Sequence, residues 1–221
     1  MSNGPLRVVL LLNNPYMADS RSWKLANSLT AAGCEVTVVA RAADGLPVRE
    51  SRDGYRIVRV AQPATLAWLP APALPRARAG SDGVPDRPAP GDRERIRDTV
   101  GRGAQAGRYL LRARAWAKAI SEALGDGPVD IWQSEGLITL PVALRLRRKR
   151  GGRVVYDSRD IHLQSARFAL LPGPWRELLQ RRERSWAQAA DAVVTVNKPY
   201  AAYLERSLGR EPTLVVNGPV P

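Results

Sequence analysis

Short apolar runs alternate along the chain with longer amphipathic segments. The run Arg7–Leu12 (RVVLLL) ends at the breaker Asn13-Asn14-Pro15, which is typical of a fully buried strand. Further strands are predicted at Val36–Ala40, Tyr55–Val60, Val129–Gln133, Arg153–Tyr156, Ala192–Val196 and Thr213–Val216. Helices are predicted at about Ser20–Ala32, Ala104–Leu124, Ile138–Arg150, Leu163–Ala190 (interrupted by Pro172-Gly173-Pro174) and Pro199–Leu208. Strands that alternate with helices form βαβ units, so we predict an α/β fold, a Rossmann-like parallel sheet with flanking helices.

One segment breaks this alternation. Between Pro63 and about Gly103 the chain holds seven prolines, many arginines and no helix or strand period. We therefore predict a flexible Pro/Arg-rich insertion at about 62–103 within one domain that covers residues 1–216. Its first part, which includes Trp68, is apolar enough to touch a membrane or a partner, although an ordinary flexible loop is the simpler interpretation.

The charge of the chain favours anionic partners. Its 221 residues hold 34 Lys and Arg against 21 Asp and Glu, a net charge of +13, and all but four of the cations are arginine. Arg145–Arg153 and Arg176–Arg184 form two basic clusters that could meet anionic lipid headgroups, although cations at a helix end also simply complement its dipole. Nucleic acid is a less favoured partner, because the tryptophans fall at core-like positions rather than in a stacking row.

Several classes of protein are excluded. No apolar run reaches the roughly 18 residues that a membrane span needs, and one cysteine (Cys34) and one histidine (His162) exclude a disulfide framework and a multi-histidine metal site. The first loop, Asn13 to Arg21, has no glycine, so a dinucleotide fingerprint is absent, as are P-loop and G-x-S-x-G motifs. We expect a cytoplasmic protein, either free or peripheral on the inner face of the membrane.

Polar side chains follow the ends of several predicted strands. In open α/β sheets, ligands bind outside the carboxyl ends of the strands. The segment Tyr156–His162 combines carboxylates, a guanidinium and the single imidazole, which could orient a hydroxyl and move a proton, and Arg159 could bind a phosphate. The alternative is a loop held together by pairing of Arg159 with Asp157 or Asp160. The candidate residues at this edge are Asn13, Asn14, Glu135, Asp157, Arg159, Asp160 and His162.

Five motifs in order carry a family resemblance. They are Leu29–Val38 (LTAAGCEVTV), Asp130-Ile131-Trp132 with Leu140-Pro141, Tyr156–Ile161 (YDSRDI) with Ser165-Ala166, Ala190–Asn197 (ADAVVTVN) with Leu204, and Val215–Pro219 (VVNGP). With them, the chain resembles the N-terminal domain of GT-B glycosyltransferases of the large retaining group called family 4. It departs from that family in its first loop, which lacks glycine, and at His162-Leu163-Gln164, where the family has Trp-Pro-Glu.

The resemblance implies the acceptor-binding half of an enzyme that moves a sugar from a nucleotide sugar to a hydroxyl acceptor, with retention and with no metal or cofactor. On this resemblance, residues 217–221 would begin the link to a C-terminal donor domain, which we expect to lie outside these 221 residues. The alternative is a non-catalytic basic module that binds an anionic membrane or a glycan. On the resemblance, the catalytic candidates are Asp160 and His162, and the substrate-binding candidates are Asn13, Asn14, Glu135, Asp157 and Arg159.

Overall fold

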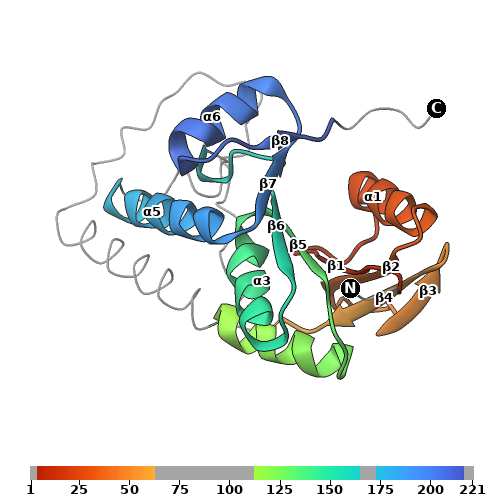
Figure 1. Cartoon of the computed structure of the whole chain (residues 1–221). Helices are drawn as coiled ribbons and strands as arrows, with labels where there is room; N and C mark the ends of the chain where they lie inside the picture. The colour runs from red at the N-terminus through yellow and green to blue at the C-terminus, as the bar shows by residue number, and fades with distance from the viewer. Residues whose placement is uncertain (1–3, 63–111, 165–172, 217–221) are drawn as a thin grey trace, which may run out of the picture.

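An eight-stranded sheet forms the centre of the molecule (Figure 1). The computed structural model describes residues 4–62, 112–164 and 173–216. The strand order is β3-β4-β2-β1-β5-β6-β7-β8, and every neighbouring pair except β3–β4 is parallel. The predicted α/β fold is thus confirmed. The strands are β1 (Arg7–Leu11), β2 (Glu35–Arg41), β3 (Arg49–Arg52), β4 (Tyr55–Val60), β5 (Ile131–Glu135), β6 (Arg153–Asp157), β7 (Ala192–Thr195) and β8 (Thr213–Leu214).

Helices cover both faces of the sheet (Figure 1). They are α1 (Ser20–Ala31), a helix whose described part is 112–124, α3 (Gly136–Arg150), the short 3-10 helix η1 (His162–Gln164), α5 (Gly173–Ala189) and α6 (Lys198–Leu208). None of these described helices is both long enough and apolar enough to cross a membrane.

The buried strand β1 divides its side chains between two cores. Val8 and Leu10 pack beneath α1 with residues of β2 and β4, whereas Val9 and Leu11 join the core beneath α3. Successive side chains of a strand point to opposite faces, so a continuous apolar run is what a sheet covered on both sides requires. The layered arrangement therefore follows directly from the sequence of β1.

Strands β3 and β5 differ most from the prediction. Strand β3 was not predicted, because Arg49-Glu50-Ser51-Arg52 carries no apolar side chain; it pairs antiparallel to β4 at the edge of the sheet, where charge is normal. Strand β5 was predicted at Val129–Gln133 but lies two residues later. Its register with β1, in which Leu11 lies opposite Ser134, brings Ser134 and Glu135 into the strand rather than the loop.

Some predictions concern residues outside the described part of the chain. The predicted insertion at about 62–103, which includes Trp68, lies outside it except for Gln62. The first part of the helix predicted at Ala104–Leu124 and the link at 217–221 lie outside it as well. The strand predicted at Thr213–Val216 is shorter than expected and ends at Leu214.

The strand order reverses at β1. From β1 the chain proceeds through β2 to β4 on one side, and returns to place β5, β6 and β7 on the other. Loops that leave β1 and β5 therefore turn toward opposite faces, which opens a crevice at the carboxyl edge. This position is where an open α/β sheet binds its ligands.

Candidate functional site

A cavity of about 210 Å³ opens at this reversal point, between the ends of β1, β5 and β6. Its lining residues come from three segments far apart in the sequence: Asn13, Asn14, Glu135, Gly136, Leu137, Ile138, Arg159 and Asp160. Five of the seven predicted site residues therefore line the same cavity. Asp157 supports the cavity wall from beneath, through Arg159.

Arg159 is the centre of the cluster, and its side chain is only 15% exposed. Its Nη1 lies 2.8 Å from Glu135 Oε1 and 3.2 Å from Asp19 Oδ1. Its Nε donates to Asp157 Oδ2 at 3.1 Å, and its Nη2 donates to Ser22 Oγ at 2.8 Å. Four of the five N–H donors of the guanidinium are thus used within the described protein, which leaves one Nη2–H for a ligand.

This arrangement changes the expected role of Arg159. A free guanidinium fork could have gripped a phosphate, but here three carboxylates surround it and compensate its charge. Although burial opposes it, the charges of Glu135, Asp157 and Asp19 raise the pKa of Arg159, which therefore stays charged. Hydroxyl groups suit this polar, compensated surface better than a phosphate does.

Glu135 is the last residue of β5 and immediately precedes α3. Its Oε2 accepts a hydrogen bond from Ser22 Oγ at 3.0 Å, while Oε1 faces Arg159. Burial raises the pKa of Glu135 to about 7; the nearby Asp19 carboxylate adds to this rise, and the Arg159 charge only partly opposes it. A carboxyl group with this pKa can both give and take a proton near neutral pH.

Asp157 ends strand β6 and is almost fully buried, with 1% of its side chain exposed. Its carboxylate accepts hydrogen bonds from Arg159, from Arg21 at 3.4 Å and from the side-chain amide of Gln133 at 3.4 Å. The pairing of Arg159 with Asp157, which was the alternative interpretation of this loop, is thus confirmed. Asp157 fixes Arg159 in place, and direct contact with a substrate stays a prediction.

The loop after β1 is built by its own polar side chains. Asn14 Oδ1 accepts from the backbone N–H of Tyr16 at 2.8 Å, and its Nδ2 donates to Asp19 Oδ2 at 2.9 Å. These bonds hold Tyr16 at a φ of +59°. Asn13 accepts a hydrogen bond from Gln62, which reaches the loop from the end of β4. Both asparagines line the cavity, as predicted, and Asn14 also shapes it.

Asp160 lies exposed at the mouth of the cavity. Its carboxylate has no hydrogen bond or ion pair within the described residues, whereas its backbone carbonyl accepts from Ser158 Oγ at 3.2 Å. His162 is the first residue of η1 and follows Asp160 by two positions. Its side chain lies outside what the structure describes.

Sequence reasoning missed the contribution of α1. Asp19 is the N-cap residue of α1, and its side chain accepts from the backbone N–H of Ser22 at 3.0 Å. Burial alone would raise the pKa of Asp19, but the hydrogen bonds from Ser22 and Asn14 and the charge of Arg159 lower it. Its pairing with Arg159 spans 140 positions, and no local signal in the sequence announces such a contact.

Comparison with known proteins assigns this architecture. The sequence matches the glycosyl transferase 4-like domain family over residues 19–219. No curated protein matches the chain in sequence. Similar solved structures include sucrose-phosphate synthase from Thermosynechococcus elongatus, with a TM-score of 0.56 and 14% identity over 96% of this chain and 47% of that one.

Two further solved structures share the fold. CalG4, the calicheamicin glycosyltransferase, has a TM-score of 0.52 and 14% identity over 97% of this chain and 53% of that one. Os79 from O. sativa, solved in complex with UDP, has a TM-score of 0.51 and 17% identity over 96% of this chain and 51% of that one. The chain spans about half the length of each. It belongs to the glycosyl transferase 4-like domain family and has the fold of the N-terminal half of a GT-B glycosyltransferase.

Proposed function

We propose that the chain is the acceptor-binding half of a glycosyltransferase that moves a sugar from a nucleotide sugar to a hydroxyl acceptor in the synthesis of a glycan or glycoside. The family match over residues 19–219 carries this proposal. The cavity supports it, because it lies at the reversal point of the sheet and is lined by hydrogen-bonding side chains suited to hydroxyl groups. The nucleotide sugar would be held mainly by a donor-binding domain facing this edge.

Four residues take specific parts in this proposal. Asp160 accepts the proton of the attacking hydroxyl, because its carboxylate is exposed at the mouth of the cavity and has no partner within the described residues. Glu135 and the free N–H of Arg159 orient the acceptor from inside. His162 remains a catalytic candidate from its position two residues beyond Asp160. Positioning two substrates in one closed cleft contributes several kcal/mol to lowering the barrier.

The stereochemistry is also a proposal, which rests on the resemblance to the retaining group. In such a transfer the bond between the anomeric carbon and the donor phosphate breaks, and the acceptor oxygen bonds to that carbon on the same face. The departing phosphate takes up the electron pair of the broken bond as negative charge, and the proton of the acceptor hydroxyl passes to Asp160. Proton NMR of the fresh product measures the anomeric configuration directly, and an inverted product would contradict retention.

The experiment that tests the role of Asp160 compares Asp160→Asn with a matched control in the chain assembled with a donor-binding glycosyltransferase domain. Loss of a general base should lower kcat by roughly 10²–10⁴-fold. Asp126→Asn makes the same chemical change at an exposed position near the opposite edge of the sheet and should leave kcat unchanged. Unimpaired turnover by Asp160→Asn would move the chemistry away from this loop, and absence of sugar transfer by the unmodified assembly would contradict the proposed activity.

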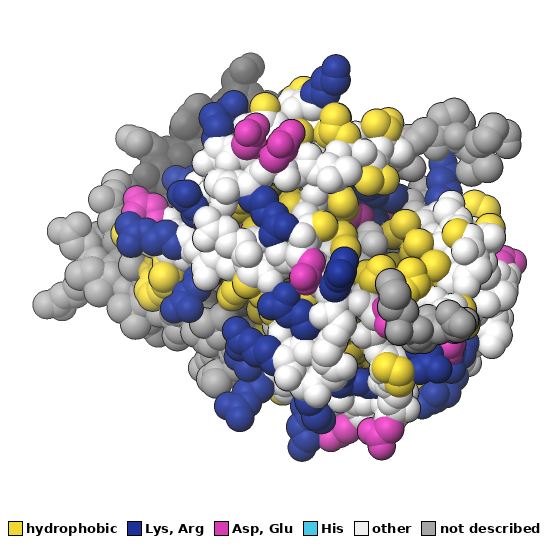
Figure 2. Space-filling view, in the orientation of Figure 1, with side chains coloured by type: hydrophobic (Ala, Val, Ile, Leu, Met, Phe, Trp, Pro, Cys, Tyr) yellow, Lys and Arg dark blue, Asp and Glu magenta, His cyan; other side chains and the backbone are white. Residues whose placement is uncertain are grey.

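A second proposal is that a basic surface attaches the chain to an anionic membrane, either beside sugar transfer or, in a non-catalytic module, instead of it. Lys and Arg outnumber Asp and Glu on the face shown in Figure 2. In the last turn of α3, Arg148 is exposed, as is Arg153 at the start of β6, and neither has an ion pair within the described residues, whereas Arg147 is paired with Asp191. Co-sedimentation with vesicles tests this attachment, which should weaken as salt rises. Equal binding to neutral vesicles would contradict it.

A further inference from the structure

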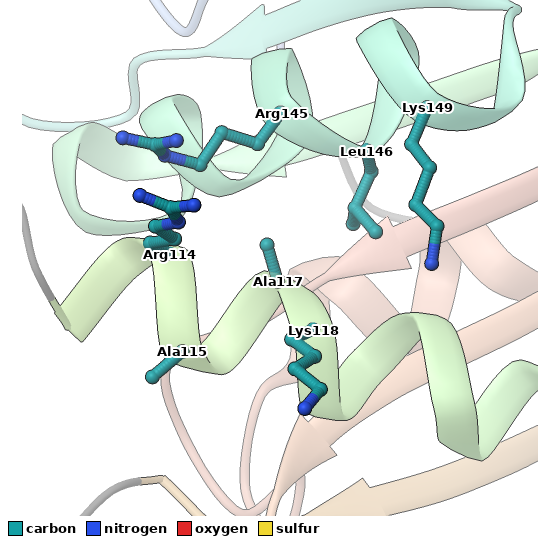
Figure 3. A pocket seen from close by; sticks show the side chains of 7 residues that line it. All are labelled: Arg114, Ala115, Ala117, Lys118, Arg145, Leu146 and Lys149. Atoms are coloured by element: carbon teal, nitrogen blue, oxygen red, sulfur yellow. The ribbon is translucent and has the colours of Figure 1, made fainter.

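A groove of about 480 Å³ lies between α3 and the helix that includes 112–124, away from the candidate site (Figure 3). Arg145 lies nine residues along α3 from Gly136 at the cavity, which is about 13 Å of helix. The groove is therefore a separate feature. Four cationic side chains line it: Arg114, Lys118, Arg145 and Lys149. Ala117 and Leu146 form its apolar floor.

Two guanidinium groups face each other at one end of this groove. Figure 3 shows the side chains of Arg114 and Arg145 pointing toward one another from the two helices. Neither forms an ion pair within the described residues, and no carboxylate lines the groove. Neighbouring like charges repel each other, and an anion bound between them would attract both and so offset that repulsion.

The two lysines leave the groove strongly positive. Lys118 Nζ lies 3.8 Å from a carboxylate oxygen of Glu122 on the exposed side of the same helix. Solvent screens this ion pair, so it neutralises the charge of Lys118 only weakly. Among the residues that the structure describes, Lys149 Nζ donates only to the uncharged hydroxyl of Ser121, at 3.4 Å. The floor is different in character, because Ala117 and Leu146 are buried and apolar.

We propose that this groove binds phosphate groups. Arginine offers a planar fork that matches phosphate oxygens in pairs, and two forks with two ammonium groups can hold one diphosphate or two neighbouring phosphates. The apolar floor would accept a carbon chain or ring next to the phosphate. This inference rests on the second proposal above, attachment to an anionic partner, and makes that proposal more specific. It does not depend on sugar transfer. The phosphate can belong to a lipid headgroup or to a soluble phosphate ester.

The test uses the full chain and two probes. Inorganic pyrophosphate is titrated calorimetrically, and vesicles of phosphatidylcholine with or without phosphatidylglycerol are sedimented. Arg114→Gln/Arg145→Gln removes both forks, and Lys198→Gln/Arg206→Gln removes the same charge from exposed positions on α6, outside both basic clusters. We expect the groove variant to lose at least tenfold in affinity and the control variant less than twofold. Both pairs are at the surface, so an unchanged midpoint of thermal unfolding checks that each variant folds.

The two probes also distinguish the source of the phosphate. Tight binding of pyrophosphate with little vesicle binding supports a soluble phosphate ester, and the reverse supports a lipid headgroup. Equal losses in the two variants would overturn the proposal, because they would show attraction by net charge alone. Failure of the unmodified chain to bind either probe would overturn it as well. A complete enzyme that carries the groove variant should retain full sugar transfer to a soluble acceptor, so failure of this inference leaves the activity proposal separately testable.

Discussion

At the scale of single residues, Arg159 ties three segments of the chain to one another. It is mostly buried, with Asp19, Glu135 and Asp157 around it. Replacing it with Met leaves these carboxylates without their shared counter-ion, and breaking a buried pair from one side typically destabilises by about 3 kcal/mol or more. Urea denaturation at pH 8 should show this loss for Arg159→Met and little change for the exposed Arg206→Met. Equal stability of the two variants would contradict the bridging role.

Glu135 should make stability depend on pH in a defined direction. Its folded pKa of about 7 lies above the unfolded value of about 4.3, so the folded state binds more protons between these limits. Its contribution to the free energy of unfolding therefore falls as pH rises from 4.5 to 7 and stays low above 7. Glu135→Gln lacks this titration, so its stability relative to the native chain should increase by roughly 2–3 kcal/mol between pH 4.5 and pH 8. Denaturant titrations at both pH values measure it, and a constant difference would contradict the raised pKa.

At the scale of elements, the connection from α3 to β6 depends on a glycine. Gly152 has a φ of +87°, and a Cβ there would lie 2.3 Å from the carbonyl oxygen of Val129. Gly151 also has a positive φ, of +74°, but a Cβ there meets nothing within 4 Å. Both alanine variants are strained, and only Gly152→Ala adds the clash, so it should be less stable than Gly151→Ala by roughly 1–3 kcal/mol. Thermal unfolding compares the two variants. Equal midpoints would contradict the prediction, because they would show that the backbone shifts to relieve the clash without loss of stability.

The elements also show what the sequence pattern can and cannot predict. Apolar strands such as β1 and β4 were predicted to within one residue, because burial on a sheet demands their side chains. The start of β5 was not, because hydrogen bonds determine it: the Arg7 N–H donates to the side-chain Oδ2 of Asp130, and the register with β1 begins at Ile131 opposite Val8. The edge strand β3 has no apolar signal, since only pairing with β4 defines it.

At the scale of the whole molecule, the alternation of strands and helices predicted the fold, and the rule for carboxyl edges predicted the edge of the sheet at which the candidate residues gather. Asn13, Asn14, Glu135, Arg159 and Asp160 do meet in one cavity. The partners of Arg159 on α1 could not be predicted in this way, because Asp19 and Ser22 are 140 and 137 positions distant from it. Such contacts depend on how the two halves of the sheet meet, which no local pattern records.

The central claim is that sugar transfer takes place at the cavity between β1, β5 and β6. The most direct measurement is kcat/KM for the acceptor at saturating nucleotide sugar, in the chain assembled with a donor-binding domain, for Arg159→Lys and Arg206→Lys. Lysine keeps the charge but cannot reach Glu135, Asp19 and Asp157 together, so the cavity wall loses its geometry. We predict a fall of about 10²-fold for Arg159→Lys, measured where it remains folded, and no change for Arg206→Lys. Equal values for the two variants would contradict the assignment of the site.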